Sequence, residues 1–132
     1  MSEHHAPTGS VSSAISNAAV RLLREYTGRG PTKAKTTIDR DVVVILLADT
    51  MTKAEHTLAT TGDAKFVLDM RHRFQQAMRE DLVAAVEINT ERKVIAFMSG
   101  NHIDPDMAAE IFVLEPQPDG ETQAPESDLQ VQ

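Results

Sequence analysis

The feature that most restricts the fold is an uninterrupted apolar run, six residues long and rich in β-branched side chains, from Val42 to Leu47. Such a run is typical of a central β-strand. The preceding segment, Lys33 to Ile38, alternates polar and apolar residues, which predicts a half-exposed strand. Because only Asp39-Arg40-Asp41 separates the two segments, we predict that they form a β-hairpin.

A helix is predicted before this hairpin, from Val11 to Tyr26. Apolar residues recur there at spacings of three and four, at Ile15, Ala18 or Ala19, Leu22 and Tyr26. Ser10 or Ser12 is placed to cap its start. Gly28 is placed to end it in a left-handed conformation, and Pro31 prevents helical continuation.

A second helical region is predicted after the hairpin. Thr52 and Glu55 match a capping box, so a short helix is expected from there to about Thr60, with Gly62 ending it. Asp63 is placed to cap the helix that follows.

One long helix is then predicted from Ala64 to about Asn89, with a length of roughly 35–40 Å. That length is large for a chain of this size, so we expect a kink or a partner subunit. Phe74 and Met78 mark its buried side. Arg71 and Arg73 are predicted to lie on a solvated, charged face, paired with neighbours one turn away.

Two more apolar β-type runs complete the pattern, at Lys93 to Met98 and at Ile111 to Leu114, the latter beginning as early as Ala108. The element order is therefore α-β-β-α-α-β-β. Strands interrupted by helices in this way indicate an α+β fold. We expect a four-stranded, largely antiparallel sheet with the helices packed on one face.

Composition bounds the class of protein. The 132 residues suit one domain, contain no cysteine and carry a net charge of −7. Residues 11–115 hold 15 acids and 13 bases, so this part is nearly neutral and does not favour nucleic-acid binding. We predict one α+β domain at 11–115 between disordered tails at 1–10 and 116–132. No run reaches the ~20 apolar residues of a membrane span, and no signal peptide is present, so we expect a cytosolic protein.

The first polar motif, Gly28-Arg29-Gly30-Pro31, follows the first predicted helix. One interpretation is a helix stop and a turn into the first strand. The other makes Arg29 a presented cation for a carboxylate or phosphate, helped by backbone N–H groups beside the glycines. The motif is not a phosphate-binding P-loop, because it follows a helix and lacks the Gly-Lys-Ser/Thr ending.

The second motif runs from Asn101 to Asp106, between two apolar runs. One interpretation is a turn in which Asn101 and Asp104 make side-chain hydrogen bonds to the backbone. The other is an oxygen-rich site where His102, Asp104 and Asp106 converge on a divalent cation or a proton. With a single histidine and no EF-hand pattern, we expect no metal here.

Several segments together resemble the MpsC family, named for a component of a sodium-translocating, membrane-potential-generating system. The resemblance covers about residues 12–115, and it is carried by these segments: 15–18, 24–33, 42–47, Leu58, 74–86, 93–99, 101–106 and 110–114. Gly28-Arg29-Gly30-Pro31 is its most distinctive part. The chain departs from the family at Asn89-Thr90-Glu91-Arg92, where the family tends to have a Thr-Gly turn. The resemblance implies association with a membrane ion-transport system and supplies no catalytic residues.

These observations lead us to expect a cytosolic, non-enzymatic accessory domain without a cofactor. It would self-associate as a dimer and dock on a membrane transport complex at the inner face of the membrane, without inserting into the bilayer itself. Two alternatives stay open. One is a small-molecule or ion sensor that combines Arg29 with the Asn101–Asp106 loop, and the other is an enzyme that uses His102 with Asp104 or Asp106.

Overall fold

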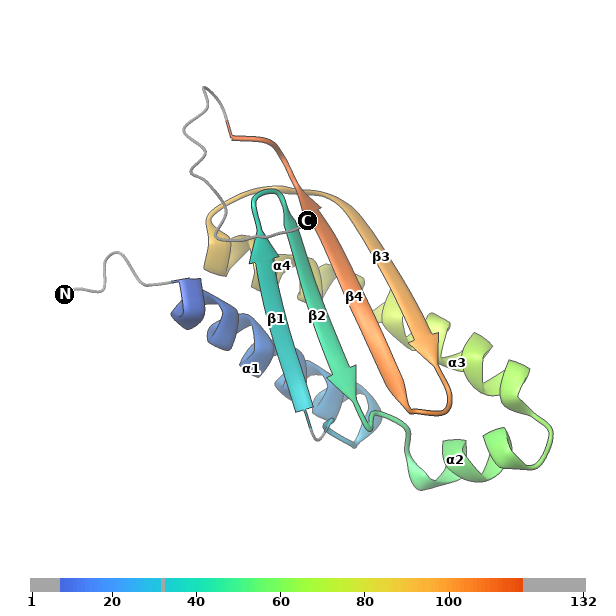
Figure 1. Cartoon of the computed structure of the whole chain (residues 1–132). Helices are drawn as coiled ribbons and strands as arrows, with labels where there is room; N and C mark the ends of the chain where they lie inside the picture. The colour runs from blue at the N-terminus through green and yellow to red at the C-terminus, as the bar shows by residue number, and fades with distance from the viewer. Residues whose placement is uncertain (1–7, 32, 118–132) are drawn as a thin grey trace.

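A computed structural model describes residues 8–31 and 33–117 (Figure 1). The elements follow the predicted order: α1 (Thr8–Thr27), β1 (Lys33–Asp39), β2 (Val42–Ala48), α2 (Lys53–Thr60), α3 (Ala64–Ala77), α4 (Arg79–Thr90), β3 (Val94–His102) and β4 (Met107–Leu114). Helix α1 begins at Thr8, inside the segment predicted to be a tail. The remaining parts of both predicted tails, 1–7 and 118–132, lie outside the described residues.

The four strands form one antiparallel sheet in the order β1-β2-β4-β3. β1 with β2, and β3 with β4, are hairpins, while β4 also pairs with β2 in the middle of the sheet. The predicted fold class is therefore confirmed. Helices α1, α3 and α4 lie on one face of the sheet, and α2 lies beyond the end of β2 (Figure 1). In the described part of the chain, the opposite face carries no helix.

The core lies between the sheet and its helices. Alternate residues of β2 and β4 point into it: Val43, Ile45, Leu47, Ala108, Phe112 and Leu114. Helix α1 contributes Ile15, Ala19 and Leu23, and α4 contributes Leu82 and Val86. Because side chains alternate along a strand, the residues between these buried positions face away from the helices.

The predicted long helix is two helices, separated at Met78. The backbone hydrogen bonds Met78 N to Phe74 O and Leu82 N to Met78 O are both 2.9 Å, so Met78 is bonded to both helices across the bend. No proline or glycine lies at this bend. The bend keeps the Met78 side chain in the core and directs α4 along α1.

The ends of the helices confirm two of the predictions made for individual residues and contradict one. Thr52 and Glu55 form the predicted capping box. Gly28 has a φ of +82° directly after α1, as predicted for a helix stop. Asp63 precedes α3 but makes no capping hydrogen bond with its side chain, so the predicted cap is wrong. Glu91 ends α4 with a φ of 60°, a left-handed conformation that favours glycine.

Candidate functional site

The Gly28–Pro31 loop joins the end of α1 to the start of β1, at an edge of the sheet. Gly28 N donates to Arg24 O at 2.9 Å, and Arg29 N donates to Thr27 Oγ1 at 3.2 Å. These two backbone N–H groups are therefore used within the loop and are not available as an anion nest. The Arg24 guanidinium lies against Gly30, where its Nη2 would be 3.0 Å from an added Cβ. Arg29 itself is exposed.

The Asn101–Asp106 segment is divided among three environments. His102 ends β3 in an exposed position, and its Nδ1 lies 2.8 Å from Pro105 O. Asp104 is exposed in the turn. Asp106 is buried and accepts hydrogen bonds from Thr50 Oγ1 at 3.1 Å and Met51 N at 2.8 Å. The structure therefore does not bring His102, Asp104 and Asp106 together at one site.

Asn101 differs most from the prediction. It lies within β3, not in the turn, and its side chain faces α3. There Asn101 Nδ2 donates to Gln75 Oε1 at 2.8 Å, and Gln75 Nε2 donates to Asn101 Oδ1 at 3.1 Å. The predicted side-chain turn at Asn101 is therefore wrong, because a strand residue that faces the helices finds its partner across the layer.

The two predicted motifs lie at the same end of the sheet but on its two opposite edges. β1 begins there, next to the end of β2, while β3 ends there next to the start of β4. Two strands stand between the edges, which corresponds to roughly 14 Å. A combined site of Arg29 with the Asn101–Asp106 loop is not assembled in this arrangement.

A buried polar network fills the space between this end of the sheet and α2 and α3. Arg71 is at its centre: Nη2 donates to Thr50 Oγ1, Nε to Asn101 Oδ1 at 3.2 Å, and Nη1 lies 3.4 Å from Glu55 Oε1. Asp106 joins the network through Thr50. A buried ion pair surrounded by hydrogen-bond partners fixes the position of the helices on the sheet.

Glu110 forms the far end of this network. Gln75 Nε2 donates to its Oε2 at 2.9 Å, and Ser99 Oγ donates to its Oε1. Only 2% of Glu110 is exposed. Burial raises the pKa of this carboxyl, while the hydrogen bonds from Ser99 and Gln75 and the charge of Arg71 oppose the rise. A void of about 10 Å³, room for about one water molecule, lies beside Glu110, Arg71 and Thr27.

Sequence reasoning placed Arg71 on a solvated face, and that prediction is wrong. Arg71 is 8% exposed, whereas Arg73, two residues on, is exposed as predicted. The signal was present in the spacing, because Val67, Arg71 and Gln75 are four residues apart and therefore share one side of the helix. Among the described residues, no three His, Asp or Glu side chains lie close enough to hold a metal ion.

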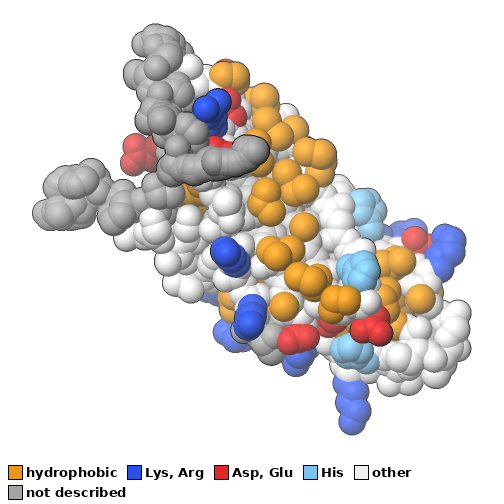
Figure 2. Space-filling view, in the orientation of Figure 1, with side chains coloured by type: hydrophobic (Ala, Val, Ile, Leu, Met, Phe, Trp, Pro, Cys, Tyr) orange, Lys and Arg blue, Asp and Glu red, His pale blue; other side chains and the backbone are white. Residues whose placement is uncertain are grey.

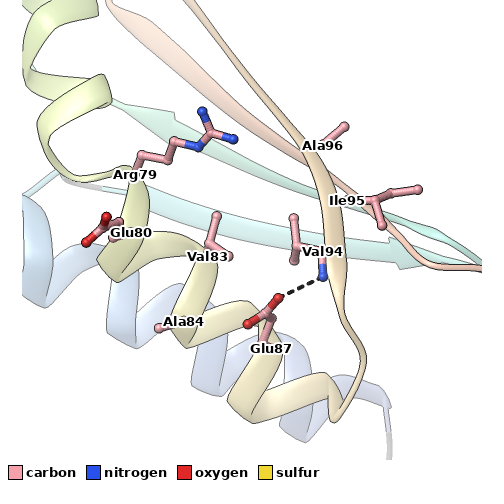
Figure 3. A pocket seen from close by; sticks show the side chains of 8 residues that line it. All are labelled: Arg79, Glu80, Val83, Ala84, Glu87, Val94, Ile95 and Ala96. Carbon is pink, nitrogen blue, oxygen red and sulfur yellow. Dashed lines mark hydrogen bonds between the residues drawn. The ribbon is translucent and has the colours of Figure 1, made fainter.

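A shallow groove of about 230 Å³ runs between α4 and the edge strand β3 (Figure 3). Val83 and Val94 lie at its floor, and Glu87 spans it, with Oε2 2.9 Å from Val94 N. Beside it, β3 has an irregular register between Val94 and Ala96. An occupied N–H and a bulge both hinder the addition of another strand at this edge.

The largest unexplained feature is the sheet face without helices, which we call the open face. It is lined by alternate strand residues: Val42, Val44 and Leu46 of β2, Ala109, Ile111 and Val113 of β4, and Met98 of β3. Leu46 is 41% exposed and Met98 is 49% exposed. Figure 2 shows hydrophobic side chains as a band across this face, with Lys and Arg side chains on one flank.

The fold and this surface define a class: a small α+β domain with one helix-covered and one open, apolar sheet face. Residues 8–116 match the family described as Na+-translocating membrane potential-generating system (MpsC). The chain belongs to the MpsC family. No curated protein and no solved structure matches it. In residues 8–31 and 33–117, none of the helices combines the length and apolarity that crossing a bilayer requires.

Proposed function

We propose that this chain is a soluble, non-enzymatic accessory subunit of the sodium-translocating, membrane-potential-generating system for which its family is named, and that it acts by binding another protein. The observation that carries this proposal is the open face. The family description names the ion-translocating system. The open face is the surface through which we propose that the chain binds another protein.

The size and chemistry of the open face support a protein contact. Its apolar part spans β2, β4 and β3, because the β1 residues on this face are polar: Lys33, Lys35, Thr37 and Asp39. Three strands about 4.8 Å apart, with seven residues each at about 3.4 Å, give an apolar footprint on the order of 340 Å². Contiguous apolar patches larger than a few hundred Å² are rare on monomers and usually bind something. Removing apolar surface from water stabilises the bound state by about 25 cal/mol per Å².

The Gly28–Pro31 loop offers a second, polar contact. Its backbone is held by Thr27 and by the left-handed Gly28, so the exposed Arg29 side chain is presented from a defined position. The loop lies at one end of the sheet, before the start of β1, and not on the open face. We propose that Arg29 contributes to docking on an acidic surface of the transport complex, at the cytoplasmic side.

The geometry favours neither alternative. A sensor site would need Arg29 near the Asn101–Asp106 loop, and the strand order places them on opposite edges. An enzyme would need a carboxylate within reach of His102, whereas the Nδ1 atom of His102 lies 2.8 Å from the Pro105 carbonyl oxygen.

The test is capture of the tagged full chain from detergent-solubilised native membranes, read by mass spectrometry, with three proteins in parallel. The wild type should recover a membrane subunit of the transport system. Leu46→Lys, which charges the open face, should lose it. Ile88→Lys is the matched control, because Ile88 is a 75% exposed aliphatic residue on α4, away from the open face. Equal recovery by all three would contradict the proposal.

A further inference from the structure

We propose that the open face packs against the same face of a second copy of this chain, giving a face-to-face dimer with two sheets in the middle and helices outside. This inference rests on the proposed function, in which the open face is a protein contact. It assigns that face to a second copy, so that docking on the membrane subunit, to which Arg29 contributes, requires the dimer. Two sheets packed in this way lie about 10 Å apart with their strand directions nearly aligned.

The composition of the open face fits a second sheet. Its central side chains are aliphatic and of moderate size: Val42, Val44, Leu46, Ala109, Ile111 and Val113. Side chains of this kind from two sheets interdigitate as in a β-sandwich. The apolar footprint of about 340 Å² is less than half of the ~800 Å² that each partner buries in a standard interface, so the polar β1 row and the charged rim must be buried as well.

The charged side chains at the rim of the open face are complementary between two copies of the chain. A two-fold axis parallel to the strands places β1 of one copy over β3 of the other, with the same ends together. Lys33 and Lys35 on β1 then approach the turn that carries Asp104, and Asp39 approaches the start of β3 beside Lys93. All five side chains are exposed. Each basic corner of one copy therefore meets an acidic corner of the other.

Other occupants fit the open face less well. The segments outside the described residues contain Leu129 and Val131 as their only branched aliphatic side chains, too few to cover an apolar face. Strand addition at the β3 edge is hindered by its bulge and by Glu87 bound to Val94 N. A foreign protein remains an outcome that the experiment can reveal.

The first test is sedimentation equilibrium of the purified full chain over a wide concentration range. The wild type should be a reversible dimer. Leu46→Lys and Met98→Lys, at two separate exposed positions of the open face, should each raise the dissociation constant by about 100-fold or more. The control, Ile88→Lys, should leave it unchanged. Circular dichroism confirms that each variant is folded.

A second test addresses the arrangement and uses the absence of native cysteine. Thr37, Val44, Ile111 and Met98 form one row across the sheet, so Thr37 of one copy should face Met98 of the other. The double variant Thr37→Cys/Met98→Cys should give a covalent dimer with a short bifunctional thiol cross-linker that spans the roughly 10 Å between the sheets, whereas neither single variant should. Within one chain the two positions lie roughly 14 Å apart, and a link between them leaves the chain a monomer.

The outcomes separate this inference from the proposed function. A wild type that is monomeric at every concentration, or a dimer that neither open-face variant weakens, overturns the dimer. A monomer that still captures a membrane subunit through the open face would leave the proposed function standing without it. A dimer that captures no membrane subunit would support the dimer and contradict the proposed function. Failure of the double variant to cross-link overturns the aligned arrangement.

Discussion

Leu46 on β2 lies directly opposite Ala109 on β4, and the two side chains lie in the middle of the sheet face that helices α1 to α4 leave uncovered. The same strands bury Ile45 and Leu47 on the other face, so β2 is apolar on both sides. A strand that is apolar on both faces is expected where both faces are covered. One cover is the helical layer, and we propose that the other is a second copy of this chain.

The buried network predicts a large difference between two neighbouring arginines. Arg71→Met leaves Glu55 without its ion pair and Asn101 and Thr50 with fewer partners, so it should lower the free energy of unfolding by about 3 kcal/mol. Arg73→Met, at an exposed position of the same helix, should change it by less than about 0.5 kcal/mol. Urea denaturation compares the two. Equal effects would show that the network does not support the fold.

Glu110 predicts a pH-dependent contribution to stability. Burial raises its folded pKa above the ordinary value of 4.5, so the folded state holds the proton more tightly than the unfolded state. The contribution of Glu110 to the free energy of unfolding is greatest below the pKa that it has in the unfolded chain. It is lost as the pH rises through the pKa of the folded state. Glu110→Gln removes this pH-dependent contribution. The free energy of unfolding of the variant, relative to that of the wild type, should therefore increase from pH 4.5 upward. Denaturation at a series of pH values measures the difference, and a constant difference would contradict the prediction.

The end of α4 predicts a stabilising substitution. Glu91 adopts a φ of 60°, which costs a residue with a Cβ more than it costs glycine. Glu91→Gly should therefore raise the free energy of unfolding by up to about 1 kcal/mol and the melting temperature by a few degrees. Glu91→Ala is the control, since it removes the charge without relieving the backbone. A gain in both variants would attribute the effect to the charge.

Arg29 predicts a loss of binding without a loss of stability. Its side chain is exposed, and the loop is held by Thr27 and by the backbone of Gly28. Arg29→Ala should leave the melting temperature unchanged and reduce recovery of the membrane subunit in the capture experiment. Arg21→Ala provides the comparison, because Arg21 is also exposed but lies on α1 and not in the loop. If Arg29→Ala binds its partner normally, Arg29 has no role in docking.

Local signals predicted the fold well. The alternation in Lys33–Ile38, the apolar run at Val42–Leu47 and the Thr52–Glu55 capping box each depend on residues close in sequence, and each is observed. The bend at Met78 was harder to locate, because no proline or glycine lies there. It serves packing against the sheet and α1, which only the assembled fold defines.

The contacts of the candidate site were harder to predict from the sequence than the fold was. Arg71 finds its partners in Glu55, Thr50 and Asn101, from three other segments of the chain, so charge patterns along one helix gave the wrong environment. The open face had a visible signal, because every residue of Val42–Leu47 is apolar. Which side of that strand the helices would leave uncovered could not be deduced from the strand alone.

The most direct measurement of the central claim, that the open face binds protein, is photo-cross-linking in living cells with benzoylphenylalanine placed at Leu46. The account predicts a covalent adduct whose tryptic peptides come from a second copy of this chain or from a subunit of the transport system. The same probe placed at Ile88 should give no such adduct. If the probe at Leu46 labels no protein and the probe at Ile88 gives the same result, the open face is not a protein contact.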